Sequence, residues 1–306
     1  MRPLETGHAA ARLEYQVFTA KRPAGLSRDL PPGYESLAWV ANSATLIYGK
    51  RDAVLVDTFL TIEENVKLAD EIAATGKNLT YIYVTHGHGD HFFGINALKE
   101  RFPNVRAVAT ASVVDRMAGQ LEPEMMDGFW RRLFPGQISD DPGMAESLGG
   151  ASIELEGHPL IPIATGFTDT ADSTSLHVPS LGLVAAGDVV YNGFHQYLGE
   201  SNAQTRLEWI DALDTLDALE PRAVVAGHKI PEHDDDPRNI AETRQYLRDF
   251  IRLDQATDSP RALFDAMIEL YTDRGNPGSL WAGANAAKRE AGNGSPSTPA
   301  NAARKD

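Results

Sequence analysis

Residues 85–91, Thr-His-Gly-His-Gly-Asp-His, stand at the end of an apolar run, Tyr81–Thr85, that is typical of a buried strand. Four side chains able to bind a metal ion fall within six residues. Gly87 and Gly89 let the backbone turn sharply, so that alternate side chains can converge. Neutral imidazoles and a carboxylate are common ligands of zinc and other transition metals. The segment therefore predicts a metal site at the end of a strand.

The residues before this loop predict a hairpin and a helix. Two β-rich runs, Ala44–Tyr48 and Ala53–Asp57, are separated by a short polar turn. Residues 61–75 carry apolar residues at helical spacing, with Thr61 placed to cap the start and Gly76 just past the end.

Strands and helices continue after the loop. The apolar patterns predict helices at 92–101, 206–219, 237–254 and 260–273, and strands at 105–109, 152–155, 160–164, 175–178, 182–186 and 223–226. This order of elements predicts an α/β fold in which mixed sheets are covered by helices.

The chain divides into three parts by composition. Residues 1–35, rich in Pro, Gly and charge, are expected to form an N-terminal arm, and residues 36–275 the main domain. Within it, residues 120–150 break the alternation and could form a lid over a binding site, or a surface helix packed on the domain. Residues 276–306 are expected to form a disordered tail, because from Gly283 onward the chain has no large apolar side chain.

Composition and charge restrict the function. Lys plus Arg number 28 and Asp plus Glu 43, so the net charge of −15 disfavours nucleic acid as a partner. No apolar run is long enough to span a membrane, and the N-terminus lacks the apolar core of a signal peptide, so a cytoplasmic location is expected. The chain has no cysteine, which leaves histidine and carboxylate side chains to bind a metal.

The His-rich loop resembles the His-x-His-x-Asp-His signature of the metallo-β-lactamase-fold hydrolases. Three further segments follow in the order of that family, namely Val54–Thr58, Ala186-Gly187-Asp188 and Ala226-Gly227-His228. The resemblance spans residues 40–230 and implies an αββα sandwich made of two mixed sheets covered by helices.

The resemblance also implies a set of metal ligands. It assigns His86 and His88 to a first metal, assigns Asp90, His91 and His228 to a second, and places Asp188 as the carboxylate that bridges them. Asp57 is expected to accept a hydrogen bond from a ligand histidine or from the loop backbone, although an Asp that only closes a turn after a strand is an alternative.

One position departs from the family pattern. The family supplies a third histidine to the first metal, in a Gly-His-Thr context, and here Phe167 stands between Gly166 and Thr168. Phenylalanine cannot bind a metal. On this alignment the first site is impaired, and one or two zinc ions per chain are expected, with the second site better occupied. Iron or manganese are alternatives.

The expected activity is hydrolysis of a small-molecule carbonyl compound: a lactone, ester, thioester or β-lactam. A metal lowers the pKa of a bound water, which attacks the carbonyl carbon. Asp90 is the candidate that passes a proton to the leaving group, and Tyr191 or His195, which follow Asp188 closely, could stabilise the oxyanion.

Two other functions stay open. A non-haem iron oxygenase on the same fold would also use two histidines and a carboxylate. A binding protein with weakened catalysis would follow if the missing ligand had abolished turnover. The metal content of the protein separates these alternatives. The oligomeric state is not predicted.

Overall fold

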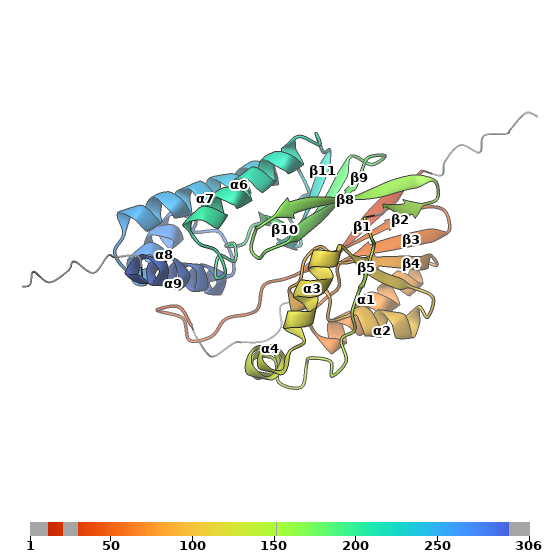
Figure 1. Ribbon diagram of the computed structural model, residues 1–306, viewed down its shortest axis with the longest axis horizontal. Helices are drawn as coiled ribbons and strands as arrows, with labels where there is room; N and C mark the ends of the chain where they lie inside the picture. Colours follow the sequence, from red (N-terminus) through yellow and green to blue (C-terminus); the bar gives the residue numbers. More distant parts are fainter. Residues whose placement is uncertain (1–11, 21–29, 151, 294–306) are drawn as a thin grey trace, which may run out of the picture.

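The computed structural model describes residues 12–20, 30–150 and 152–293. Two β-sheets lie face to face, and helices cover their outer faces (Figure 1). The predicted α/β sandwich of two mixed sheets covered by helices is therefore confirmed.

The first sheet has six strands in the order β1-β2-β3-β4-β5-β6. The first three are antiparallel, and β3 to β6 run parallel. Because parallel neighbours end at the same edge, β3 and β4 deliver the residues that follow them to one place. The strands are β1 Glu14–Thr19, β2 Ser43–Tyr48, β3 Asp52–Val56, β4 Asn78–Tyr83, β5 Arg106–Ala109 and β6 Glu146–Ser147.

Helices pack on the outer face of the first sheet. Thr61 caps the first of them by accepting a hydrogen bond from the Glu64 backbone, as predicted. Thr110 caps the third in the same way, by accepting from the Val113 backbone. The elements are α1 Ile62–Ala74, the 3₁₀ turn η1 Gly89–His91, α2 Ile95–Arg101, α3 Ala111–Gln120, α4 Pro123–Met125, the π-helical turn η2 Met126–Trp130 and α5 Arg131–Leu133.

The second sheet has five strands in the order β11-β10-β9-β8-β7, with β10 and β11 parallel. Two helices, α6 and α7, cover its outer face, α8 and α9 pack against α7, and together they bury a core around Trp209, Tyr246 and Phe250. The strands are β7 Ile153–Leu155, β8 His158–Gly166, β9 Ser173–Val178, β10 Leu183–Asn192 and β11 Ala223–Lys229; the helices are α6 Ala203–Asp217, α7 Arg238–Ala256, α8 Pro260–Leu270 and α9 Pro277–Asn293.

A separate apolar layer joins the inner faces of the two sheets. Val54 and Val108 of the first sheet meet Leu176 and Val225 of the second in one buried cluster. Alternate residues of the same strands point to the outer helices, so the central strands are buried on both faces. This packing holds the ends of β4, β10 and β11 in fixed positions.

Both predicted boundaries of the main domain are wrong. Residues 14–19, placed in the N-terminal arm, form β1 and pair with β2. Residues 277–293, placed in the disordered tail, form α9, in which Leu280, Ala284 and Ala287 are buried. Small side chains let this helix approach the core closely, so it needs few large apolar residues. The remaining tail, 294–306, lies outside the described residues.

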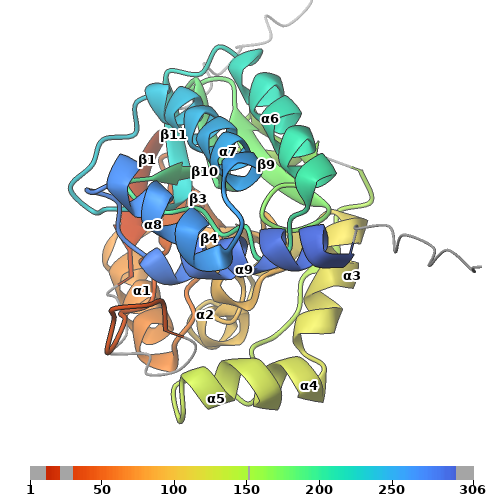
Figure 2. The same ribbon diagram turned by 90° about the vertical axis from the view of Figure 1, so that its left-hand side faces the viewer.

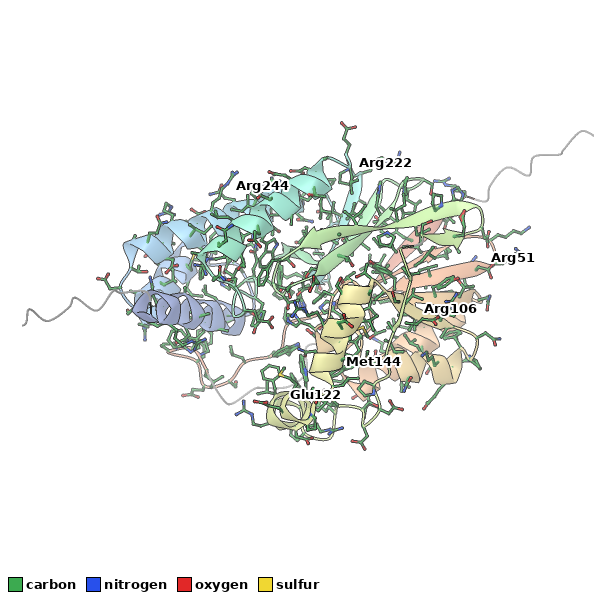
Figure 3. All side chains as sticks on the ribbon, in the orientation of Figure 1. Arg51, Arg106, Glu122, Met144, Arg222 and Arg244 are labelled. Atoms are coloured by element: carbon green, nitrogen blue, oxygen red, sulfur yellow. The ribbon has the colours of Figure 1, made fainter. Side chains whose placement is uncertain are left out.

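The charged side chains project outward from this framework (Figure 3). Arg51 and Arg106 stand at the end of the first sheet that is remote from α9, and Arg106 pairs with Glu146 at 2.6 Å. No helix among the described residues combines the length and the hydropathy needed to cross a bilayer.

Candidate metal centre

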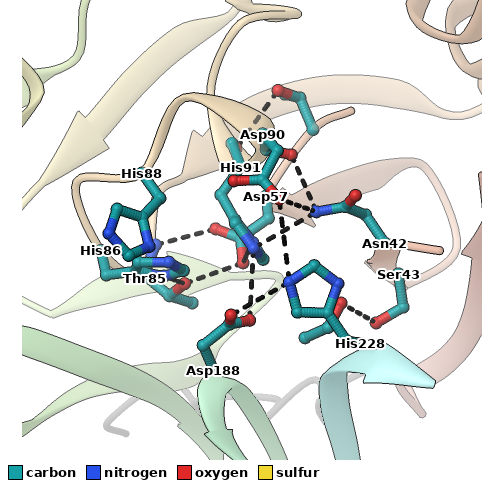
Figure 4. Close-up of polar contacts among 12 residues, drawn as sticks. Asn42, Ser43, Asp57, Thr85, His86, His88, Asp90, His91, Asp188 and His228 are labelled. Atoms are coloured by element: carbon teal, nitrogen blue, oxygen red, sulfur yellow. Dashed lines mark hydrogen bonds and ion pairs between the residues drawn. The ribbon is translucent and has the colours of Figure 1, made fainter. Parts of the chain in front are cut away.

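The residues predicted to bind metal lie together at the strand ends (Figure 4). The loop after β4 and the turn η1 supply His86, His88, Asp90 and His91, β10 supplies Asp188, and β11 supplies His228. Three groups have ligand atoms within 4.8 Å of one another: His86, His91 and Asp188; His86, His88 and Asp169; and Asp90, His91 and His228. The sequence predicted six of these seven residues.

Asp188 lies between two of the histidines. Its Oδ1 atom is 3.2 Å from Nε2 of His91, and its Oδ2 atom is 3.0 Å from Nε2 of His228. Asp90 approaches the same imidazole from the other side, with Oδ2 at 3.7 Å from Nε2 of His228. These residues are at most 5% exposed.

Asp169 completes the cluster on the side of His86 and His88, and the sequence analysis missed it. Its Oδ2 atom lies 2.8 Å from Nδ1 of His88 and 3.6 Å from Nε2 of His86, and the residue is fully buried. The alignment that put Phe167 at the third ligand position left His86 and His88 without a further side chain of their own, and the structure places Asp169 against both of them. The chain presents a carboxylate there, two residues later.

Each histidine has its other ring nitrogen held by a neighbour. His86 Nδ1 lies 3.0 Å from Oγ1 of Thr85, and His91 Nδ1 lies 3.1 Å from Oδ2 of Asp57. His228 Nδ1 lies 3.2 Å from the Ala41 carbonyl oxygen, and His88 Nε2 lies 2.9 Å from Oε1 of Glu200. Such contacts fix the orientation of a ligand ring and leave the opposite nitrogen free to bind a metal.

Asp57 accepts three hydrogen bonds at the end of β3. Oδ1 accepts from the backbone amide of Thr85, and Oδ2 accepts from the Thr85 hydroxyl and from His91. Its φ of 60° lies in the left-handed region, which is strained for a residue with a side chain. The three hydrogen bonds offset this strain, in agreement with the predicted contact to a ligand histidine.

Glycine is required beside Asp188. A Cβ atom on Gly227 would overlap the Asp188 carboxylate, and one on Gly187, where φ is 56°, would lie 2.5 Å from Oγ1 of Thr85. The two glycines thus let β10 and β11 bring their ligands against the His-rich loop.

The electrostatics of the cluster suit cations. Burial lowers the pKa of His86, which favours the neutral imidazole needed for ligation. Burial opposes ionisation of Asp188, yet His228 and His91 hold the pKa of that carboxyl well below its usual value. His86 Nε2 is buried without a hydrogen bond, and Asp169 Oδ2 and Asp188 Oδ1 face only ring nitrogens of the other candidate ligands. Unpaired buried polar atoms are costly, so this donor set fits divalent cations.

The two residues predicted to stabilise an oxyanion have different surroundings. The Tyr191 hydroxyl donates a 2.6 Å hydrogen bond to Oδ2 of Asp188 and lies at the cavity beside the cluster. His195 does not reach the site: it is fully buried, and its Nδ1 atom lies 3.0 Å from the Tyr246 hydroxyl. The expectation for His195 is wrong because β10 extends to Asn192 and carries the following residues past the cluster, into the packing under α7.

A cavity of about 240 Å³ opens onto the cluster. Its polar end is formed by cluster residues and Glu200, while the segment 120–150 contributes Met125, Phe129 and Trp130 to its apolar end. Asn42, also missed from the sequence, donates to Oδ2 of Asp90 at 3.1 Å. No local motif marks Asn42 or Glu200, because both contacts join segments that are distant in sequence.

Comparison with known proteins identifies the architecture. The model of the metallo-beta-lactamase superfamily matches residues 37–228. UPF0173 metal-dependent hydrolases are 26% identical in Brucella ovis and 27% in Brucella anthropi over 172 residues, which is 50% of this chain and 72% of each relative.

Solved structures of similar shape agree with this match. A metallo-beta-lactamase family protein from Thermus thermophilus aligns with a TM-score of 0.62 and 19% identity, covering 92% of this chain and 94% of that one. A metallo-beta-lactamase from Pontibacter korlensis aligns with a TM-score of 0.54 and 18% identity, covering 76% of this chain and 99% of that one. At these identities the likeness concerns the fold.

Proposed function

The chain belongs to the metallo-β-lactamase superfamily, and on that premise we propose that it is a metal-dependent hydrolase of small-molecule carbonyl compounds. The observation that carries the proposal is the convergence of four histidines and three aspartates, whose ring nitrogens and carboxylate oxygens face one another. Relatives that match half of this chain are called metal-dependent hydrolases.

The cluster offers two complete sets of ligands. His86, His88 and Asp169 would hold the first cation, Asp90, His91 and His228 the second, and Asp188 would be shared. Divalent cations held there would supply Lewis-acid activation of a water molecule and of the substrate carbonyl. On this proposal the first site, which the sequence predicted to be impaired, would take Asp169 as its third ligand.

Other side chains prepare the cluster for this chemistry. Tyr191 fixes the Asp188 carboxylate through its hydroxyl, and burial together with Asp188 raises the pKa of that phenol, so it stays a donor. Asn42 holds one oxygen of Asp90 and leaves the other to carry a proton to a leaving group. The aromatic wall of the cavity limits the access of bulk water.

We propose an ester, lactone, thioester or β-lactam as substrate, and zinc as the metal. Zinc accepts mixed imidazole and carboxylate ligands, and manganese or iron accept the same donors. The set His86, His88 and Asp169 favours one second candidate, a non-haem iron oxygenase, since two histidines and one carboxylate also bind iron(II).

Metal analysis and turnover together test the proposal. The purified protein should contain about two divalent cations per chain and should hydrolyse at least one member of a panel of esters, lactones, thioesters and β-lactams. Asp188→Asn should lower both metal content and turnover, whereas Asp211→Asn on the exposed side of α6 should change neither. Iron with oxygen consumption would favour the oxygenase, and full hydrolysis after complete metal removal would overturn the proposal.

A further inference from the structure

The cavity at the metal centre continues into a second hollow, here called the outer groove, of about 530 Å³. Six residues line both spaces, namely Trp39, Val40, Phe129, Tyr197, Asn276 and Ser279. The metal-binding side chains line only the inner cavity. The outer groove is therefore adjacent to the metal centre but is not lined by its candidate ligands. A groove of this volume can hold a small molecule.

One face of α9 forms a wall of the outer groove. Trp281, Asn285 and Arg289 follow one another at intervals of four residues, so they lie along one side of the helix, and all three line the groove. The side that carries Leu280 and Ala284 is buried in the core. Figure 2 shows α9 running past the α4–α5 segment, whose Phe129 and Leu133 line the groove opposite.

Arg289 gives this groove its polarity. Among the described residues that line it, Arg289 is the one charged side chain, and the others are apolar, aromatic or neutral. It is exposed, and it makes no ion pair or hydrogen bond with another described residue. An unpaired guanidinium among aromatic and neutral lining residues is suited to bind an oxyanion in two-point contact.

We infer that the substrate is an amphipathic monoanion, bound with its scissile carbonyl at the metal centre, its apolar body along Trp39 and Phe129, and its anionic head at Arg289. The inference rests on the proposed function, because the metal centre determines which end of the substrate is hydrolysed. Charge supports this direction. Carboxylates line the inner cavity, and a guanidinium lines the outer groove, while the protein as a whole carries −15. The guanidinium therefore attracts an anionic head to the outer groove rather than to the carboxylates of the metal centre.

Tryptophan fluorescence can test the binding mode without turnover. Three of the four tryptophans, Trp39, Trp130 and Trp281, line the two spaces, and Trp209 is buried in the core. The probes are 1-decanesulfonate, 1-decanol and decyltrimethylammonium, which share one chain and differ in charge. Sulfonate is chosen because it is a weak ligand for divalent cations, so its binding reports on the groove.

The sulfonate should bind at least about tenfold more tightly than the alcohol, and the ammonium compound least tightly. Arg289→Gln should remove the preference for the sulfonate while leaving the affinity for the alcohol unchanged. Arg51→Gln is the matched control, since Arg51 lies at the remote end of the first sheet (Figure 3). Equal binding of all three probes, or a preference that survives Arg289→Gln, would overturn the inference.

Hydrolysis gives a second, separable readout. Half-esters of decanedioic acid and matched decanoate esters differ only in a terminal carboxylate, so Arg289→Gln should raise KM for the half-ester alone. Charge-selective binding without hydrolysis of any member of the ester, lactone, thioester and β-lactam panel would refute the proposed function and keep the anion subsite. Hydrolysis of both esters with equal KM would keep the proposed function and refute the anion subsite.

Discussion

Nε2 of His88 lies 2.9 Å from Oε1 of Glu200, while Nδ1 of the same ring faces Asp169 at 2.8 Å. Glu200 is itself held by the Thr170 hydroxyl, which donates to Oε2 at 2.7 Å. The His88 ring therefore cannot turn without losing a contact to a carboxylate that is already fixed. Glu200 is a positioning residue, which acts on the metal centre through His88.

Glu200→Ala should weaken metal binding without unfolding the protein. Loss of a partner that orients a ligand histidine typically costs about 10–100-fold in metal affinity. Glu200→Gln keeps an acceptor oxygen for His88 and should lose less. Competition with a chelator measures the effect, and Glu208→Ala, on the exposed side of α6, is the control. Equal metal retention in all variants would show that Glu200 does not position His88.

Substitutions at Asp169 should change the metal content of the protein, whereas substitutions at Phe167 should not. Asp169→Ala removes a carboxylate that faces His86 and His88, so it should lower the metal content towards one ion per chain. Phe167→Leu should leave metal content unchanged. Phe167→His should gain no metal, because the third position is already filled. Element analysis of the three variants, prepared with the same metal supply, measures the number of metal ions per chain. A higher metal content in Phe167→His would show that residue 167, and not Asp169, stands at the third ligand position.

His195 should affect stability at acid pH more than catalysis. Burial, with a smaller effect of Arg274, lowers its pKa from 6.5 to about 3, so the folded protein holds a neutral imidazole. The unfolded chain binds the extra proton below pH 6.5, and stability is therefore lost as the pH falls from 6.5 towards 3.

His195→Phe removes this titration and keeps a ring of similar size. Its free energy of unfolding in urea should fall less between about pH 7 and pH 5 than that of the parent protein, by up to about 1.4 kcal/mol per pH unit. Its turnover at neutral pH should stay near the parent value. Parallel pH profiles would show that folding does not lower the pKa of His195, and a large loss of turnover would return it to the catalytic centre.

The candidate metal ligands nearest in sequence could be predicted because one turn contains them. His86, His88, Asp90 and His91 are brought together by local backbone geometry at the end of one strand, so their spacing is informative. Asp188 and His228 each follow an apolar run that ends in glycine, which predicts a strand end there. His228 does lie near the end of β11, whereas β10 continues past Asp188 to Asn192, with an irregular register after Gly187. Asp169 carries no such signal. Its position depends on how the chain turns between β8 and β9, and a shift of two residues selects Phe167 instead.

The ends of the fold were missed for a different reason. β1 is a six-residue edge strand whose pairing with β2 is a long-range contact, and it follows and precedes segments rich in charge, Pro and Gly. α9 buries mostly alanine, so its apolar pattern is weak, and another side of the helix lines the groove. In both elements tertiary packing, rather than local propensity, decides the structure.

The helix α9 should contribute to the stability of the whole domain. Leu280 is fully buried, so Leu280→Ala should leave a cavity and lower the free energy of unfolding by about 2–5 kcal/mol. Leu270→Ala, at the end of α8, should cost far less, since that side chain is 48% exposed. Urea unfolding of the two variants provides the comparison. Truncation after Asn276, which removes all of α9, should destabilise the protein more than Leu280→Ala and abolish the charge preference at Arg289. Equal stability of the truncated and full chains would mean that α9 does not belong to the folded core.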